Sequence, residues 1–307
     1  MSSGESDSTR EEQVGISKER SNNSREQQNS SKENPSPPIT ASLFLSTYEM
    51  PHHLELVLAG LEGQSRKDFE VLLCDDGSGP ETRQIIDGFK SRTGFALNHL
   101  WQENQGFRKC RILNRGLREA RGSTMVFLDG DCVPHRHFVR DHLENQETGR
   151  YLAGRRVELG PKLSSWLTPM RVRKGFFDYP GIQMVQSMFL KDSEHLQRTI
   201  RVTAPSLRKI LKMERIDDLK GCNYSVSRAD LEAVNGFDEE YEGYGREDTD
   251  IEVRLQHLGL KIKSLKGLAL QFHVWHPRRA FTASNDTRLE ELKKSGRVRC
   301  RMGMSRE

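Results

Sequence analysis

Two aspartates follow directly on an apolar run in the sequence TMVFLDGDCVP. Residues 125–128 are typical of a buried strand, and Asp129 and Asp131 come after them on either side of Gly130. Two carboxylates at this spacing can share a hard divalent cation, which would neutralise the oxygens of a diphosphate. Because Asp-Gly also favours tight turns, an ordinary turn explains the triplet about equally well.

A second candidate for metal chemistry is a pair of histidines near the end of a predicted strand. His273 and His276 are three residues apart, beside Trp275 and just before Pro277. Imidazole combined with carboxylate suits manganese or a similar divalent metal better than calcium. A histidine is more often an ordinary hydrogen-bonded residue than a ligand, so the pair adds modest support for a metal site.

Two acids, Glu247 and Asp248, open a predicted helix directly after a glycine-rich loop. Acids at a helix N-terminus complement the exposed amides and the helix dipole, and this capping role is the simpler explanation. The preceding sequence GFDEEYEGYGR gathers glycines, tyrosines, acids and an arginine, and loops of this kind often build binding sites. One of the two carboxylates is therefore a candidate general base.

The sequence GFRKCRILNRG places Arg108, Lys109 and Arg111 around the start of another predicted helix. Backbone amides and guanidinium groups at such a position can hold an anion. A basic, solvent-facing side of the helix is the alternative explanation.

The first half of the chain predicts the elements that position these side chains. Strands are expected at 39–46, 69–75, 95–102 and 124–128, and helices after Pro51, at 81–90 and at 107–120. Strands alternating with helices predict an open, largely parallel α/β sheet, in which ligands bind at the carboxyl ends of the strands. Asp75, Asp76 and the Asp129–Asp131 turn all fall at that edge.

The second half is less regular. A strand is expected at 221–227, and Ser227 with Asp230 resembles a capping pair that opens a helix over 228–236. A further helix is expected over 247–259 and a strand over 268–274. Residues 286–307 show no convincing apolar stripe, which indicates a loose helix or a basic tail.

Composition places the chain among soluble globular proteins. It has 307 residues, of which 34% are hydrophobic, with no run long enough for a membrane helix and no apolar signal segment, so a cytoplasmic location is expected. Five cysteines without a C-x-x-C pair indicate reduced, structural thiols. Residues 1–38, rich in Ser, Glu, Gln and Asn and lacking aromatics, are expected to be a disordered tail.

The net charge of +4 is unevenly distributed. Residues 1–40 hold seven acidic and five basic side chains, whereas residues 161–220 hold twelve basic and six acidic ones. The basic segment could face nucleotide phosphates, an anionic membrane or a nucleic acid, and a solvated basic surface is at least as good an explanation for most of these residues.

Taken together, these motifs resemble the family 2 glycosyltransferases of GT-A fold. The sequence LFLSTYEMPHHLELVLAGLEGQSRKDFEVLLCDDGSG is similar to the nucleotide-binding opening of that family, and Asp129-Gly130-Asp131 matches its D-x-D. NGFDEEYEGYGREDTDIEVRL resembles the C-terminal part of galactosyltransferase-like enzymes, and the likeness extends over about residues 41–280. Glu49, Tyr244, Arg246 and His273 stand where those families usually have Asn, Trp, Gly and Met.

The resemblance implies the fold and three sets of site residues. The fold would be an α/β open mixed sheet flanked by helices, in a single catalytic domain. The residues that would hold the nucleotide-sugar are Thr47, Tyr48, Glu49, Asp75, Asp76, Arg108, Arg111, Asp129 and Gly130. The metal ligands would be Asp131, His276 and His273. Asp248 would be the base with Glu247 beside it, and Tyr244, Gly245 and Arg246 would line the acceptor and donor pockets.

The function that the resemblance implies is a metal-dependent inverting transfer, with Mn²⁺ or Mg²⁺ as cofactor. The donor would be a UDP-sugar of the Gal, GalNAc, Glc or GlcNAc type. The acceptor would be a glycan or a lipid-linked saccharide, in surface polysaccharide or lipopolysaccharide synthesis. The expected division is a tail over 1–38, a nucleotide-binding half over 39–135, an acceptor half over 136–285 and a basic tail over 286–307.

Two other classes of protein fit parts of the sequence. A sugar-nucleotide nucleotidyltransferase would use a similar sheet, but its Gly-rich loop with Lys or Arg is absent from STYEMPHH. A basic module for nucleic acid or a membrane surface would use residues 161–220 and would bind in a salt-dependent way, but it leaves the acidic turns unexplained. We therefore expect no nucleic-acid partner, and we keep contact with an anionic membrane, at the inner face of the cytoplasmic membrane, as compatible with the enzyme.

Overall fold

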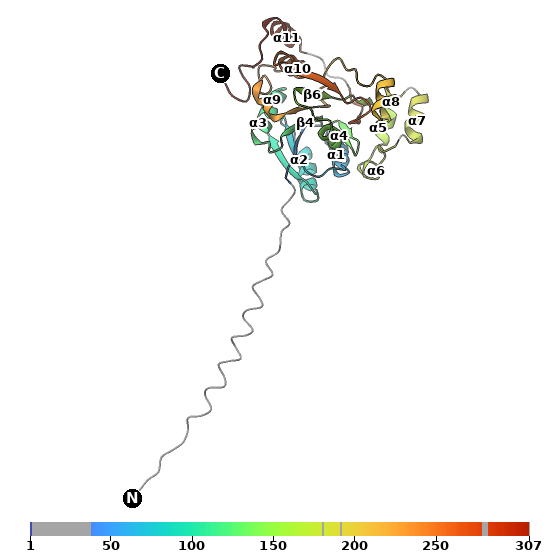
Figure 1. Cartoon of the computed structure of the whole chain (residues 1–307). Coiled ribbons are helices and arrows are strands. Elements are labelled where there is room, and N and C mark those ends of the chain that lie inside the picture. Colours follow the sequence, from blue (N-terminus) through green and yellow to red (C-terminus); the bar gives the residue numbers. More distant parts are fainter. Residues whose placement is uncertain (2–37, 180, 191, 278–281, 307) are drawn as a thin grey trace. The chain divides into compact units, whose positions relative to one another are not determined.

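The computed structural model describes residue 1 and residues 38–179, 181–190, 192–277 and 282–306. Residues 2–37 of the predicted tail over 1–38 therefore lie outside the described residues. From Pro38 onward the chain forms one compact unit. It is an α/β fold built on an open mixed sheet with flanking helices, which confirms the predicted fold class (Figure 1).

The main sheet has seven strands in the order β3-β2-β1-β4-β8-β6-β9. Its first four strands in this order are parallel, whereas β8 runs antiparallel to both β4 and β6. The parallel strands are those predicted from the first half of the sequence. Their bounds are β1 Ala41–Thr47, β2 Phe69–Asp75, β3 Ala96–Trp101 and β4 Thr124–Asp129, and those of the other three are β6 Arg150–Ala153, β8 Tyr224–Ser227 and β9 Lys261–Ser264.

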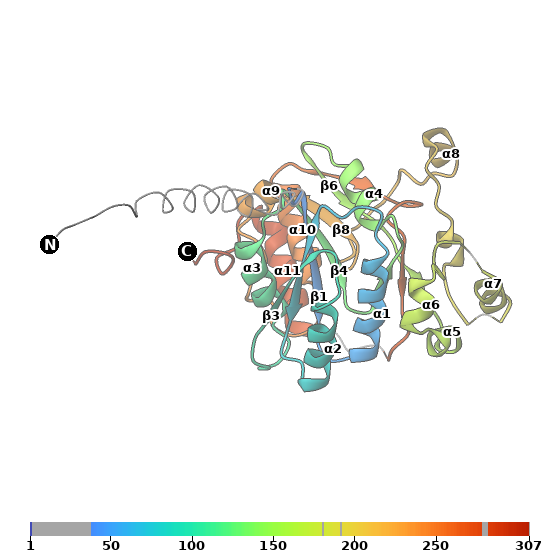
Figure 2. The same ribbon diagram turned by 90° about the horizontal axis from the view of Figure 1, so that it is seen from below.

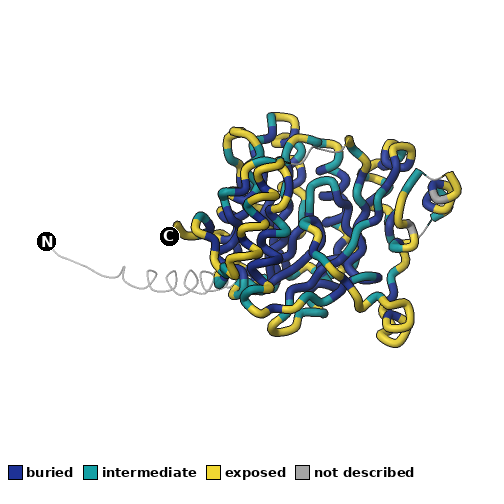
Figure 3. The backbone as a smooth tube through the Cα atoms, turned by 90° about the horizontal axis from the view of Figure 1, so that it is seen from above, coloured by how far each residue is buried: buried dark blue, intermediate teal, exposed yellow. Residues whose placement is uncertain are grey.

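Alternating side chains on the strands divide the core into two layers. On β1, Leu43 and Leu45 pack in one hydrophobic cluster with helix α1, while Phe44 between them packs in the other with α3. Figure 2 shows α1 and α2 on one side of the strands and α3 and α10 on the other, and in Figure 3 buried backbone fills the middle of the molecule while the exposed segments lie around it. The bounds are α1 Pro51–Glu62, α2 Pro80–Lys90, α3 Lys109–Glu119 and α10 Glu247–His257.

A small second sheet joins distant parts of the sequence. Its order is β5-β10-β7, with bounds β5 Cys132–Pro134, β7 Val157–Glu158 and β10 Gln271–His273. β5 begins directly after Asp131, and its antiparallel partner β10 ends at His273. The backbone N–H of Val274 also donates to the carbonyl oxygen of Asp131 over 2.8 Å. The sheet therefore holds two predicted metal ligands against each other.

The remaining helices are short and lie mostly between β7 and β8. They are α4 Phe138–Glu144, α5 Pro161–Trp166, α6 Pro169–Arg173, α7 Ile182–Phe189, the 3₁₀ helix η1 Leu196–Thr199, α8 Pro205–Ile210 and α9 Arg228–Ala233. The predicted cap of α9 is present, because the side chain of Ser227 accepts a hydrogen bond from the Asp230 backbone N–H. None of the described helices is long and apolar enough to cross a membrane.

Two details differ from the sequence patterns. The alternation over 268–274 predicted a strand with one buried face, but only β10 forms there and the intervening Ala269 and Gln271 are also fully buried. Near the C-terminus, helix α11 Ala283–Ser295 packs on α10 through Leu289 and Leu292. Two buried leucines are too few to give the apolar stripe that sequence reasoning looks for.

Candidate active site

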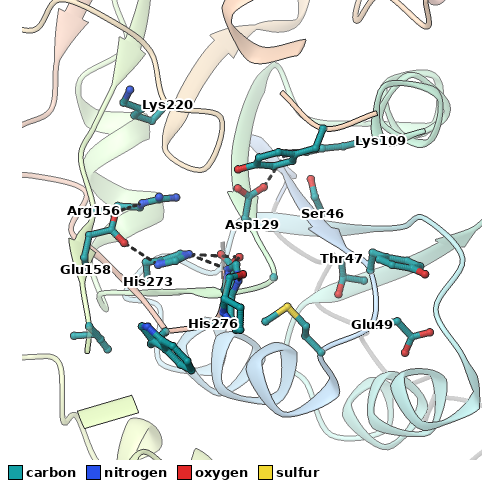
Figure 4. Close-up of a pocket in the computed structure, with 18 of the residues that line it drawn as sticks. Ser46, Thr47, Glu49, Lys109, Asp129, Arg156, Glu158, Lys220, His273 and His276 are labelled. Carbon is teal, nitrogen blue, oxygen red and sulfur yellow. Dashed lines mark hydrogen bonds and ion pairs between the residues drawn. The ribbon is translucent and has the colours of Figure 1, made fainter. Parts of the chain in front are cut away.

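A cleft of about 750 Å³ opens at the carboxyl ends of β1 and β4. This is where ligands bind in open α/β sheets, and the volume suits a small-molecule ligand. One wall comes from the second sheet and the other from the starts of α3 and α10 (Figure 4). The predicted residues that line the cleft are Thr47, Tyr48, Glu49, Asp76, Asp129, Gly130, Asp131, Tyr244, Glu247, His273 and His276.

Asp131, His273 and His276 converge on one point of this cleft. The Nε2 atoms of His273 and His276 lie 3.6 and 3.1 Å from Oδ2 of Asp131 and 3.2 Å from each other. These are the only three His, Cys, Asp or Glu residues of the described chain whose ligand atoms gather closely enough to hold an ion, within 4.8 Å of one another. Two imidazole nitrogens that face each other and the same carboxylate oxygen form a donor set that fits a divalent metal.

The electrostatics of this group follow from its ion pairs. Burial by itself lowers the pKa of His273, but its interactions with Asp131 and with Glu158, 2.8 Å from Nδ1, outweigh burial and raise the pKa to about 9. The interaction with Asp131 likewise raises the pKa of His276. Burial opposes ionisation of Asp131, yet the two imidazoles hold its pKa well below the usual range. Glu158 also fixes the orientation of the His273 ring, as carboxylates beside ligand histidines commonly do.

The opposite wall carries a lysine between two acids. Nζ of Lys109 lies 2.9 Å from Oδ1 of Asp129 and 4.0 Å from Oε1 of Glu247. Burial disfavours the charged ammonium, but the two carboxylates outweigh burial and hold the pKa of Lys109 well above its usual value. Lys109 is thus a permanent positive charge in the cleft.

The two acids at the start of α10 have different surroundings. Oε2 of Glu247 is buried and accepts no hydrogen bond from any described residue, and burial raises the pKa of this carboxyl to about 7. Asp248 is not among the described residues that line the cleft, and its two oxygens accept N–H bonds from Gly221 and Thr249. A Cβ atom on Gly221 would come within 2.8 Å of Oδ2 of Asp248, so any larger residue at this position would displace the carboxylate.

The predicted nucleotide-binding residues at the ends of β1 and β2 lie in the same cleft. Asp76 accepts hydrogen bonds from the Gln102 side chain and from the backbone N–H of Arg108, and burial raises its pKa. Gly130 packs so closely on β1 that a Cβ atom would come within 2.9 Å of the Ser46 carbonyl oxygen. The D-x-D turn therefore needs glycine between its two aspartates.

Five other predicted residues are not among the described residues that line the cleft. Asp75 is buried behind it and bonds His99 and the backbone of Ser78. The Arg108 side chain bonds Gln105 and the carbonyl of Glu103. Arg111 is exposed, Gly245 is buried, and the exposed Arg246 pairs with Asp286.

Besides Lys109, five charged residues that line the cleft were not among the predicted site residues. They are Arg156, Glu158, Asp192, Glu194 and Lys220. Arg156 pairs with Glu158 over 2.6 Å (Figure 4). Lys109 belongs to the basic motif at 106–116, and the sequence alone does not give the phase of the helix that would distinguish it from Arg108 and Arg111. Glu158 lies in the two-residue strand β7 and Arg156 directly before it, and no sequence motif marks either residue.

A D-x-D turn lies at the edge of an open mixed sheet and faces an acidic helix start across a cleft, as the resemblance to GT-A glycosyltransferases implies. Sequence comparison agrees with the geometry. The profile of "Glycosyl transferase family 2" matches residues 42–203, and that described as "N-terminal domain of galactosyltransferase" matches residues 205–277. The chain belongs to glycosyl transferase family 2, with a galactosyltransferase-like C-terminal region.

Among curated proteins, the chain is similar to the chondroitin synthase of Escherichia coli, with 25% identity over 243 residues that cover 77% of this chain and 35% of the synthase. It is 26% identical over 233 residues to the validoxylamine A glucosyltransferase of Streptomyces hygroscopicus subsp. jinggangensis, covering 71% of this chain and 52% of that enzyme. The chain thus spans between a third and about half of the length of these relatives.

Two solved structures show the same fold. The mannosyltransferase PcManGT of Pyrobaculum calidifontis, in complex with GDP-Man and Mn²⁺, superposes with a TM-score of 0.53 at 16% identity over 80% of this chain and 59% of that one. TarS of S. aureus, in complex with UDP, gives 0.54 at 16% identity over 84% of this chain and 65% of that one.

Proposed function

We propose that the protein transfers a hexosyl group from a UDP-sugar to a saccharide hydroxyl with inversion, in a metal-dependent reaction. The observation that carries the proposal is the convergence of Asp131, His273 and His276 beside a cleft that also contains Lys109 and Glu247. Mn²⁺ in PcManGT and UDP in TarS support the choice of cofactor and nucleotide. Mg²⁺ is the alternative metal.

The two walls of the cleft would have different roles. Asp131, His273 and His276 would hold the metal, which when bound supplies positive charge to the diphosphate oxygens. Lys109, fixed between Asp129 and Glu247, adds a second positive charge where the departing diphosphate gains negative charge. Residues 39–135 would bind the nucleotide, and residues 136–285 the acceptor.

A carboxylate at the start of α10 takes the proton of the attacking hydroxyl. Asp248 is the base that the family resemblance implies, and hydrogen bonds from Gly221 and Thr249 hold it in place. Glu247 lines the cleft with one unbonded oxygen and a pKa of about 7, which lies close to the best value for a base near neutral pH. The assignment between the two is decided by the single variants described in the Discussion.

The donor is one of UDP-Gal, UDP-GalNAc, UDP-Glc or UDP-GlcNAc, and the acceptor a glycan or lipid-linked saccharide of a cell-surface polysaccharide or lipopolysaccharide. The chondroitin synthase and glucosyltransferase relatives support a hexose-type donor. The test is UDP release from each donor with Mn²⁺, with Mg²⁺ and with EDTA. We expect release from one donor that EDTA abolishes, and an NMR spectrum of the product that shows the inverted anomeric configuration. No release from any donor would contradict the proposal.

A further inference from the structure

Exposed apolar side chains are concentrated in one segment of the chain. Fourteen large hydrophobic residues of the described chain are well exposed, and ten of them lie between Met170 and Leu211. Single exposed apolar residues are normal on protein surfaces, but a concentration of this kind marks an interaction surface. The segment is also where the sequence carries twelve basic and six acidic side chains, over residues 161–220.

Helix α7 presents an apolar stripe outward. Ile182, Val185 and Phe189 are 66%, 41% and 78% exposed, and their spacing of three and seven residues puts them on one face of the helix. Met184 and Ser187 are buried on the other side. In an ordinary surface helix the apolar stripe faces the core, so α7 has the reverse orientation.

Helix α8 repeats the pattern. Leu207, Ile210 and Leu211 are 44%, 74% and 50% exposed and also share one face. The buried Arg208 donates hydrogen bonds to the carbonyl oxygens of Ser264 and Lys266. These bonds fix the rotation of α8 about its axis, so the apolar stripe is held facing outward.

Exposed lysines accompany the apolar stripe of α8, and one more precedes α7 in the sequence. Lys209 and Lys212 are exposed within and just after α8, and Lys174 is exposed between α6 and α7. An apolar stripe bordered by lysines is the pattern of an interfacial helix, whose apolar side chains enter the headgroup region while the ammonium groups attract anionic lipid. A purely apolar partner would leave these charges unmatched.

We propose that α7 and α8 form a docking surface for an anionic phospholipid bilayer. Both helices project at the same edge of the molecule in Figures 1 and 2. This surface adjoins the cleft in sequence, because Asp192 and Glu194, shortly after α7, line the cleft. Docking would therefore hold the cleft near the lipid surface. The proposal does not depend on the identity of the donor or of the acceptor.

The experiment is flotation of the full chain with phosphatidylcholine vesicles, with and without phosphatidylglycerol. We expect binding only to the anionic vesicles, and a decrease as salt is raised. The double variant K209E/K212E should lower the partition coefficient by at least about 25-fold, at about fivefold for each lysine lost. The matched control K90E/K294E reverses two exposed lysines elsewhere and should bind like the wild type.

The apolar contribution is tested with I182N/F189N and with the single variant F189N. Both side chains are exposed, so the thermal midpoint should stay unchanged, while vesicle binding falls by at least about tenfold. UDP release with a water-soluble acceptor should stay at the wild-type level, which separates docking from catalysis. Equal binding to neutral vesicles, or unchanged binding of these variants, would overturn the proposal. So would a wild-type dimer that I182N/F189N converts to a monomer, since the surface would then belong to a second copy.

Discussion

Both walls of the cleft bury acidic side chains, but the pKa of the acid is lowered at one wall and raised at the other. In the group formed by Asp131, His273 and His276, the two imidazoles hold the pKa of Asp131 well below the usual range. On the facing wall, burial raises the pKa of Glu247 to about 7, although Lys109 lies 4.0 Å away. The difference is one of partners, because Asp131 directly faces two cationic groups and Glu247 has one distant cation and the neighbouring Asp248. One wall therefore keeps its carboxylate ionised, whereas the other keeps a carboxyl group that titrates near neutral pH.

The largest effect is expected from removing the carboxylate of Asp131, which we propose as a metal ligand. Asp131→Ala should abolish tight Mn²⁺ binding, measured by titration calorimetry, and should lower kcat by about 10²-fold or more, because the charge that compensates the diphosphate is lost. The exposed Asp87→Ala on α2 is the matched control. If Asp131→Ala bound Mn²⁺ with the wild-type affinity, Asp131 would not be a metal ligand.

The next largest effect is expected from the variants that distinguish Glu247 from Asp248 as the general base. Asp248→Asn and Glu247→Gln should each retain UDP and Mn²⁺ binding, and the one that removes the base should lower kcat by about 10²- to 10⁴-fold. Wild-type turnover in Asp248→Asn would assign the base to Glu247. If Glu247 is the base, kcat/KM rises with pH through about 7 as the carboxyl ionises, and Glu247→Gln lacks this rise.

The stability of Glu247→Gln tests the raised pKa without measuring turnover. The folded-state pKa of about 7 is above the usual 4.5, so the folded protein loses stability relative to its unfolded chain as the pH rises between these values. At pH above 7 this cost approaches about 3 kcal/mol. Glu247→Gln should therefore unfold at a higher urea concentration than the wild type in alkaline buffer and lose that advantage in acid. A pH-independent difference would contradict the assigned pKa.

Lys109→Met should increase the difference between the pKa values of Asp131 and Glu247. The positive charge of Lys109 lowers the pKa of Glu247, so losing that charge should raise this pKa and shift any Glu247-dependent rise in kcat/KM to higher pH. The Mn²⁺ affinity should change less than in Asp131→Ala, because Lys109 contacts Asp129 and not the ligand group. Where the wild type shows this rise, an unchanged pH profile in Lys109→Met would show that Lys109 does not act on Glu247.

The smallest effect is expected from Gly221→Ala. The added Cβ would press on Oδ2 of Asp248 and displace the carboxylate by a few tenths of an ångström. If Asp248 is the base, kcat should fall severalfold while KM for the UDP-sugar stays constant. Gly88→Ala on α2, where a Cβ atom would meet no neighbour within 4 Å, is the control.

The strands and the candidate metal ligands show what could be predicted from the sequence. The strands of the first half were predictable because their apolar runs are continuous and end in acids, and β1, β2 and β4 form where expected. Asp131 and His276 were brought together by resemblance to a family, since no local rule links residues so far apart. Their proximity depends on the pairing of β5 with β10, which each contribute three residues.

Side-chain direction at helix starts was not predictable. Arg108, Lys109 and Arg111 are close in sequence, but only Lys109 reaches the cleft, because α3 begins at this residue and its phase decides the direction of each side chain. An error of one residue in the start turns a helix by about 100°. Glu247 and Asp248 differ for the same reason.

The pairing of β5 with β10 also has an evolutionary consequence. More than a hundred residues separate the two strands, yet three backbone pairs keep Asp131 and His273 in register. The short helices α5 to α8, between β7 and β8, lie outside this pairing, so they can be lengthened, shortened or replaced without changing the register of Asp131 and His273. Such an architecture lets a lineage vary the surface beside the cleft while it keeps the arrangement of the candidate metal ligands.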